Sequence, residues 1–405
     1  MRAMYNLHRA LRERGVGSRI LCGTRTTDAP DVFRIKESAP RAISLISSAL
    51  NRSGTAIGLR NLGPINSFFL PRNTFFQEAD ILHIHSIHNS TFSYASLPSL
   101  TRNKPTVFTL HDMWPATGHC SYSYDCERWQ TGCGRCPYPD EYPPINVDST
   151  RLEWRFKRAA FEKSQISFIV PSRWMLSVMK SSVAADRPVY HIPNGIDTSL
   201  YRPLDREKCR ERLGVPRGKR VIMAGSVHVK SYRKGGDLLI QALDSLPPTL
   251  KKTCALLLMG HKTDSIARSV GMDIVDLGYV DTEERKIEAY VASDVFALPT
   301  RADNLPMTLQ ESMACGTPMV SFRVGGVPDL VRDGITGQLA EPENAGDLAR
   351  AITLILENDE LRESMRANCR RIAESEYAMD ISVARHVELY ESLTKTEDGA
   401  RGTHR

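Results

Sequence analysis

Four of the nine cysteines in this 405-residue chain lie within seventeen residues, in the stretch HCSYSYDCERWQTGCGRC. Four thiolates can close a tetrahedral zinc site, and the spacing of Cys133 and Cys136 is typical of one half of such a site. Cys120 and Cys126 would form a looser second half. A metal closed in by four side chains would be structural, with no open position for catalysis. Disulfides or four free thiols remain the alternatives.

A second group of residues lies in the stretch TRADNLPMTLQESMACG. Asp303 or Asn304 can cap a helix, and Pro306 fits its first turn. Apolar residues recur at helical spacing and predict the core-facing side: Leu305, Leu309 and Met313. Glu311 falls on another face, where it could accept both hydroxyls of a ribose while the backbone amides of Leu305 and its neighbours hold a diphosphate. The alternative is a solvated helical glutamate.

Composition favours an ordinary globular protein with 41% hydrophobic and 25% charged residues. We find no apolar run of the roughly 20 residues that a membrane helix needs, and the first residues are too polar for a signal peptide. We therefore expect a cytoplasmic protein. Residues 1–194 hold 24 Lys and Arg against 15 Asp and Glu, whereas the remainder holds 29 against 32. This basic half suits an anionic partner, such as a phosphorylated substrate or an anionic membrane surface.

Short runs rich in Val, Ile and Phe alternate with helical patterns, which predicts parallel α/β units. The first set is SRILCG, ADILHIH, PTVFTLHD, ISFIVPS and VYHIPNG. A second set follows: RVIMAGS, CALLLMG, DIVDLGYV, DVFALPT, PMVSFRV and TGQLAEP. Two serial sets predict two doubly wound domains joined through the turn-rich stretch HIPNGIDTSLYRPL.

The expected boundaries follow from this division. The first domain covers 1–194, with a cysteine-rich insertion at about 113–145, and the second covers 195–377. A helix at 378–395 should pack back on the first domain. The tail at 396–405 is expected to be disordered.

Ligands of such sheets bind beyond the carboxyl ends of the strands. The residues found there include these: His83, His85, His88, His111, Asp112, Gly225, Ser226, Gly260, His261, Arg301, Asp303, Asn304, Gly325 and Gly326.

Several motifs, in order along nearly the whole chain, resemble those of the retaining glycosyltransferases of family 4. DNLPMTLQESMACGTPMVSF is similar to the E-x7-E motif of that family, with Asp in place of the first Glu. HIPNGIDTSLYRP, VPSRWM and AGSVHVKSYRKGG resemble its IPNGID, PS-x-W and lysine-glycine phosphate segments. FTLHDMWPATGHC with the four cysteines resembles a subgroup linked to exopolysaccharide assembly, including colanic-acid-type transferases.

The resemblance implies the GT-B fold, in which two Rossmann-like domains face each other across a cleft. The second domain would hold a nucleotide-diphosphate sugar and the first a saccharide or polyprenyl-diphosphate-linked acceptor. Asp303 would lie near the hydroxyls of the donor sugar, Glu311 on the ribose and Lys234 on the phosphates. His111 would contact the donor from the first domain. Gly325 and Gly326 would lie beside the donor pocket, as would Asn304, Leu305 and Gly225.

One departure concerns Ser226, because the family usually places an arginine there. Arg233 or Lys230 could supply that second positive charge. Cleaving a sugar–phosphate bond creates an oxocarbenium-like centre and a diphosphate, which Lys, Arg and a helix terminus can stabilise. We therefore expect no metal in catalysis. The resemblance also implies retention at the anomeric carbon.

Other function classes stay open at this stage. A sugar-nucleotide epimerase or a non-catalytic sugar-nucleotide binder would share this fold. A zinc-containing nucleic-acid-binding protein is a more distant alternative, disfavoured because no basic helix adjoins the cysteines. We expect no nucleic-acid partner.

The stretch MRAMYNLHRALRERGVGSRILCG reads as a helix followed by a strand. A parallel partner strand would be expected before residue 1. The resemblance places a glycine-rich loop there as well. The sequence therefore raises the hypothesis that the first domain lacks its first strand, through a start site assigned too late or a truncated gene, and that the chain as given is inactive.

Overall fold

The structure is a computed structural model that describes residues 2–228, 231–261 and 263–402. For residues 226–228, 264–265 and 396–402 it describes the backbone alone. The chain divides into two compact units, each of which is described by itself. Unit 1 comprises Met1–Pro193 and Ser382–Arg405, and unit 2 comprises Asn194–Ile381. The division after residue 193 lies one residue from the boundary expected from the sequence.

Unit 1 contains two parallel sheets, one of two strands in the order β1-β2 and one of four in the order β3-β4-β5-β6. Its strands are β1 (Ile20–Cys22), β2 (Val32–Arg34), β3 (Leu82–Ile84), β4 (Thr106–Thr109), β5 (Ser167–Val170) and β6 (Val189–His191). Its α-helices are α1 (Arg2–Glu13), α2 (Arg41–Ala56), α3 (Thr74–Glu78), α4 (Leu97–Leu100), α5 (Thr150–Glu162) and α6 (Arg173–Lys180), joined by α15 (Met379–Gly402), which begins in unit 2. Short 3-10 helices lie between them: η1 (Ile35–Ser38), η2 (Ile65–Arg72), η3 (Tyr94–Ser96), η4 (Trp114–Ala116) and η5 (Arg128–Gln130).

The inner strands of unit 1 explain where its core lies. Every residue of β4 and β5 is buried, as expected for central strands covered on both faces. Phe108 of β4 and Phe168 of β5 pack with the fully buried Trp114 and Leu97 in one apolar cluster.

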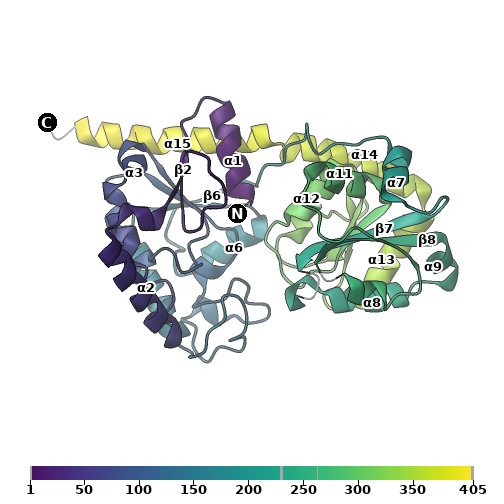
Figure 1. Cartoon of the computed structure of the whole chain (residues 1–405), viewed down its shortest axis with the longest axis horizontal. Coiled ribbons are helices and arrows are strands. Elements are labelled where there is room, and N and C mark those ends of the chain that lie inside the picture. The colour runs from purple at the N-terminus through teal and green to yellow at the C-terminus, as the bar shows by residue number, and fades with distance from the viewer. Residues whose placement is uncertain (1, 229–230, 262, 403–405) are drawn as a thin grey trace. The chain divides into compact units, whose positions relative to one another are not determined.

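Unit 2 is a six-stranded parallel sheet in the order β12-β11-β10-β7-β8-β9. Its neighbouring strands β7 and β8 are labelled in Figure 1. Its strands are β7 (Arg220–His228), β8 (Cys254–His261), β9 (Asp273–Asp276), β10 (Val295–Leu298), β11 (Met319–Phe322) and β12 (Gly337–Ala340). The helices are α7 (Arg206–Leu213), α8 (Gly236–Asp244), α9 (Pro248–Thr253), α10 (Asp264–Ala267), α11 (Glu283–Ala292), α12 (Met307–Ala314), α13 (Ala345–Glu357) and α14 (Asp359–Glu376), with 3-10 helices η6 (Tyr232–Lys234) and η7 (Val327–Asp329).

This strand order is that of a Rossmann sheet, in which the first strand lies at the centre and the order reverses beside it. β7 is that first strand, and β10 pairs directly with it. The loops that follow β7 and β10 therefore meet at the switch point, where such sheets bind their ligands.

Alternating residues of the unit 2 strands enter two separate apolar clusters. Val221 and Met223 of β7 pack with helices α7, α11, α12 and α14. Ile222 and Ala224 pack on the other face with α8, α9 and α13.

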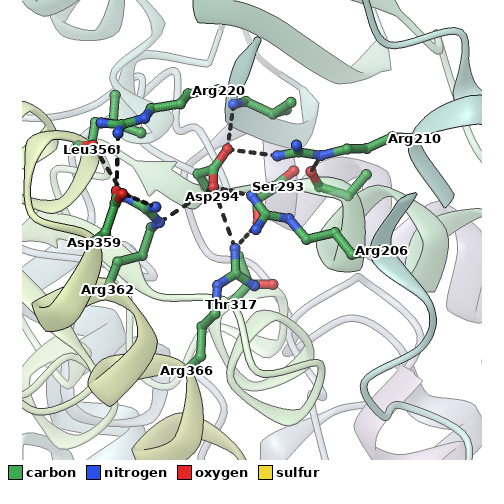
Figure 2. Close-up of polar contacts among 12 residues, drawn as sticks. Arg206, Arg210, Arg220, Ser293, Asp294, Thr317, Leu356, Asp359, Arg362 and Arg366 are labelled. Carbon is green, nitrogen blue, oxygen red and sulfur yellow. Dashed lines mark hydrogen bonds and ion pairs between the residues drawn. The ribbon is translucent and has the colours of Figure 1, made fainter. Parts of the chain in front are cut away.

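A buried carboxylate holds together the opposite end of this sheet. Asp294 directly precedes β10, is 1% exposed, and accepts the backbone N–H of Val221 at 2.7 Å. Figure 2 shows the arginines that point at its carboxylate, which are Arg206, Arg210, Arg362 and Arg366. Burial alone would raise the pKa of Asp294, but Arg206 and its neighbours hold it below the usual value. The carboxylate thus ties β7, β10, α7 and α14 to one another.

All eleven strands expected from the sequence are confirmed, as is the helix expected at 378–395. β2 was not predicted. The expected disordered tail is wrong for residues 396–402, which continue α15 to Gly402, since a helix already formed lengthens at little cost. Residues 403–405 lie outside the described part. Within the described residues we find no helix that is both long and apolar enough to cross a membrane.

Candidate functional site

The loops after β7 and β10 bring together three of the residues singled out in the sequence. Asp303, in the loop after β10, lies with its Oδ2 2.5 Å from the Nζ of Lys234 and 3.1 Å from Nη1 of Arg233. Lys234 ends η6, in the connection from β7 to α8. Along the chain Asp303 is 69 positions from Lys234 and 70 from Arg233. The three residues meet because β7 and β10 are neighbours in the sheet.

The charges in this group do not balance. Two cations face one carboxylate, and Asp303 itself is 8% exposed. Burial would raise the pKa of Asp303, but the Lys234 ammonium and the Arg233 guanidinium hold it below its usual value. Burial lowers the pKa of Lys234 against the opposing effect of Asp303. Two cationic side chains beside one carboxylate suit the binding of an anionic ligand.

Two glycines allow the loops of this site to lie so close together. A Cβ on Gly325, whose φ is +51°, would lie 2.1 Å from the carbonyl oxygen of Asp303. A Cβ on Gly235, at φ +67°, would lie 1.8 Å from the carbonyl oxygen of Pro299. Gly326 donates its N–H to the carbonyl of Asp303 at 3.0 Å. These contacts fix the backbone of Asp303 from one side and that of the Lys234 loop from the other.

Helix α12 begins at Met307, four residues after Asp303, and carries Glu311 in its second turn. Its N-cap is Pro306, so neither Asp303 nor Asn304 caps it, and that prediction is wrong. The reason is that the helix starts at Met307, so that both residues lie before the cap position, and the side chain of Asp303 instead pairs with Lys234 and Arg233. Asn304 and Leu305 are buried, at 2% and 6% exposure.

Glu311 is also buried, at 2% exposure, rather than solvated. Tyr290 on α11 donates its hydroxyl to Oε2 of Glu311 at 2.9 Å. The carboxylate is therefore held in one orientation beside the start of α12. Tyr290 has no spacing relation to Glu311 along the sequence, so only the structure reveals it.

Two further predicted positions flank the switch point. Gly225 is buried near the end of β7, where a Cβ would lie 3.1 Å from the carbonyl oxygen of Met259. Ser226 follows it in β7, but its side chain lies outside the described part, as does Lys230.

Arg301 lies in the loop after β10, and the sequence did not suggest a role for it. Its guanidinium pairs with Asp237 and Glu343 at 2.7 Å each, and it lies 4.1 Å from the centroid of the Tyr232 ring. It therefore braces the Lys234 loop against the loop after β10.

In unit 1 the predicted histidines gather at the carboxyl ends of β3 and β4. His85 Nδ1 and His111 Nε2 are 2.9 Å apart. His83 contacts Thr109 at 2.6 Å and the Tyr390 hydroxyl of α15 at 2.5 Å. Burial lowers the pKa of His111 to about 4, so its ring is neutral at pH 7. His88 lies apart from this group, 3.5 Å from Asp112 and against Trp114.

The cysteine-rich segment contains free thiols. Cys133 Sγ accepts the N–H of Gly118 at 3.1 Å, and Cys136 Sγ lies 3.1 Å from His119 Nε2. Burial raises the pKa of Cys120 to about 12 and that of Cys133 to about 11. Across the described residues, no three Cys, His, Asp or Glu side chains are placed to hold one metal ion. A zinc site on Cys120, Cys126, Cys133 and Cys136 therefore stays a prediction.

Metal analysis of protein purified under reducing conditions tests the zinc prediction. About one zinc per chain, lost in Cys133→Ser and Cys136→Ser, would support it. Metal-free protein that keeps its Tm would instead favour four free thiols, as the structure places them.

Two family models match the chain in succession. The model described as Glycosyltransferase Family 4 matches residues 2–200, and that described as Glycosyl transferases group 1 matches residues 205–372. The chain belongs to the family 4 glycosyltransferases. The acidic pair and the lysine loop described above lie inside the second match.

Curated relatives agree with this family. Over 276 residues the chain is 26% identical to WcaC of Escherichia coli strain K12, named as a colanic acid biosynthesis glycosyl transferase, covering 65% of this chain and 64% of WcaC. It is 32% identical over 183 residues to D-inositol 3-phosphate glycosyltransferase of Acidothermus cellulolyticus, covering 41% and 40%. The chain thus spans less than two thirds of the length of these relatives.

Solved structures share the fold at low identity. Sucrose-phosphate synthase of Thermosynechococcus elongatus superposes with a TM-score of 0.67 at 19% identity, covering 96% of this chain and 92% of that one. WaaG, a lipopolysaccharide biosynthesis glycosyltransferase, gives 0.65 at 16%, covering 97% and 95%. Anabaena HepE in complex with UDP gives 0.60 at 20%, covering 78% and 81%. The fold is therefore GT-B.

Proposed function

We propose that the chain transfers a sugar from a nucleotide-diphosphate sugar to a saccharide or lipid-linked acceptor, with retention, in the synthesis of a cell-surface polysaccharide. The observation that carries this proposal is the Asp303, Lys234 and Arg233 group at the switch point of unit 2. Its excess positive charge suits a diphosphate at the edge of the sheet where Rossmann ligands bind. The WcaC relationship supports the polysaccharide context.

The residues of unit 2 would share the work of holding the donor. Lys234 and Arg233 would pair with the phosphate oxygens, and the first N–H groups of α12 would face the same anion. Glu311, oriented by Tyr290, would accept the ribose hydroxyls. Asp303 would keep the Lys234 ammonium in place until the phosphates arrive, then face the sugar hydroxyls.

The transfer step needs charge stabilisation above all. The bond between the anomeric carbon and the phosphate oxygen breaks with its electron pair going to the diphosphate. The acceptor hydroxyl oxygen bonds to the same carbon from the same face, and its proton passes to the departing phosphate oxygen. Lys234 and Arg233 stabilise the negative charge that develops on that oxygen. His111 of unit 1 would hydrogen-bond the donor sugar.

A thermal-shift panel of UDP, GDP and their common sugar conjugates tests the proposal. A ligand at 100 times its Kd stabilises a protein by about 2.7 kcal/mol, so one nucleotide family should raise Tm clearly. The HepE complex with UDP-glucose makes UDP conjugates the first choice. A chain that no nucleotide stabilises would contradict the proposal, and so would conversion of the donor to its epimer without an acceptor.

We also propose peripheral attachment of unit 1 to an anionic membrane, where a lipid-linked acceptor would be met. Residues 38–77 contain four arginines and no Asp or Glu. Within this stretch, α2 exposes Leu45 at 73%, Ile46 at 50% and Leu50 at 46%. Exposed apolar side chains flanked by cationic ones are typical of helices that lie on bilayer surfaces.

Cosedimentation with vesicles tests this attachment. We expect binding to phosphatidylglycerol vesicles that weakens with salt, since each basic residue near an anionic surface contributes about 1 kcal/mol. The double variant Leu45→Ser and Leu50→Ser should bind several-fold less. Leu354→Ser on α13 of unit 2, equally exposed at 46%, is the matched control. Equal binding by all three proteins would argue against α2.

A further inference from the structure

The two neighbouring strands β3 and β4 end in histidines that face each other. β3 pairs with β4 in parallel, with Ile84 opposite Phe108, so His85 and His111 leave the sheet at the same edge. Their facing nitrogens, Nδ1 of His85 and Nε2 of His111, lie 2.9 Å apart. This is hydrogen-bond distance for two imidazoles.

The rings meet edge to edge. Their planes are inclined by only 19° and their centroids are 5.2 Å apart. The distance between the centroids exceeds the distance between the facing nitrogens by about the width of one ring. This is possible only when both nitrogens lie on the line that joins the two centroids. The N–H of one ring therefore points straight at the lone pair of the other.

Such a contact holds a single proton between the two rings. Burial lowers the pKa of His85 well below its usual value and that of His111 to about 4, so both rings are neutral and each carries one N–H. If His85 donates, the proton of His111 must be on Nδ1. If His111 donates from Nε2, its Nδ1 must be an acceptor.

We propose that His85 is a positioning residue that fixes the tautomer and ring orientation of His111, and thereby the hydrogen-bond role of His111 Nδ1 toward the substrate. The second half of this statement depends on the proposed function, because only a donor sugar gives His111 a substrate to contact. Among the described residues, Nδ1 of His111 has no hydrogen-bond partner of its own.

His85 is itself fixed from behind. The ring of His83 lies 4.0 Å from that of His85, centroid to centroid. His83 is held in turn by Thr109 of β4 and Tyr390 of α15, and His386 of α15 lies 5.6 Å from it. The C-terminal helix thus supports the histidine pair through His83.

The test is the ring ¹⁵N spectrum of His111 in the full chain labelled with ¹⁵N-histidine, assigned with His111→Gln. In the wild type we expect two well-separated shifts, those of one neutral tautomer. In His85→Ala the two shifts should move toward each other as the tautomers interconvert. In His85→Asn, whose amide reaches the place of Nδ1, they should stay apart.

Tyr390→Phe is the comparison variant, because it weakens the support of His83 but leaves the His85–His111 contact itself in place. It should change the His111 shifts less than His85→Ala does. Averaged shifts in the wild type would overturn the proposal, and so would shifts that do not respond to His85→Ala in a protein that keeps its Tm.

Hydrolysis of UDP-glucose separates this proposal from the proposed function. In His85→Ala, kcat should fall roughly 10- to 100-fold with little change in KM, and His85→Asn should recover most of it. A tautomer that responds to His85→Ala without any turnover of nucleotide sugars would uphold the positioning role and count against the proposed function. Turnover that His85→Ala leaves unchanged would overturn the positioning role alone.

Discussion

Lys234→Ala is expected to weaken binding of the nucleotide-diphosphate sugar by about 10- to 100-fold and to abolish measurable transfer. A charge-assisted hydrogen bond contributes roughly 1.5–3 kcal/mol, which is that change in Kd. Transfer should suffer more than binding, because Lys234 also stabilises the charge that develops on the departing phosphate. Isothermal titration with the nucleotide chosen by the thermal-shift panel measures the first effect.

Two other variants test whether the loss of binding is specific to the proposed donor site. Lys219 lies directly before β7, and its ammonium pairs with Asp273 at 3.0 Å. Lys219→Ala should bind the donor like the wild type. Glu311→Gln, chosen over alanine because Glu311 is buried, should also weaken binding through loss of the ribose contact. Unchanged donor affinity in both Lys234→Ala and Glu311→Gln would show that the donor binds elsewhere.

Asp294→Ala is expected to lower the free energy of unfolding of unit 2 by roughly 3–5 kcal/mol, the usual cost of removing one partner from a buried ionic group. The variant would leave four arginines facing one another without their carboxylate (Figure 2). In a unit of this size each kcal/mol corresponds to about 2–4 °C in Tm. The loss should therefore be visible as an early transition in far-UV circular dichroism.

The tryptophans make it possible to assign that transition. All four, Trp114, Trp129, Trp154 and Trp174, belong to unit 1. In Asp294→Ala, the Tm followed by tryptophan fluorescence should therefore fall less than the Tm followed by circular dichroism. Glu374→Ala, which breaks a pair between the exposed Glu374 and Arg370, is the control and should cost less than about 1 kcal/mol. Equal stability of the Asp294 and Glu374 variants would refute the role of Asp294.

Hydrophobic patterning predicted most of the fold because it reflects burial on both faces of a parallel sheet. Runs such as VFAL and MVSF are wholly buried in β10 and β11. β2 was not predicted because it is only three residues long, VFR, and only Val32 among them is buried. Residues 396–402 were misjudged because the absence of apolar anchors says nothing about continuation of a helix that already exists.

The site was predictable in part. Lys234 and Asp303 lie in segments with phosphate-loop and acidic-motif patterns, and the strand order then brings them together. Their ion pair, however, depends on side-chain packing that no local pattern encodes. The same holds for the Tyr290 contact of Glu311, the Arg301 brace and the pairing of His85 with His111, each of which joins different loops or helices.

Hydrogen–deuterium exchange of the full chain with saturating UDP, and in parallel GDP, tests the central claim most directly. We predict that one of the two slows exchange in the segments 231–237, 299–312 and 324–330, which carry Lys234, Asp303, Glu311 and Gly325. The same protection should disappear in Lys234→Ala. Nucleotide binding that leaves these three segments unprotected, or protects only residues 113–149 of unit 1, would contradict the account.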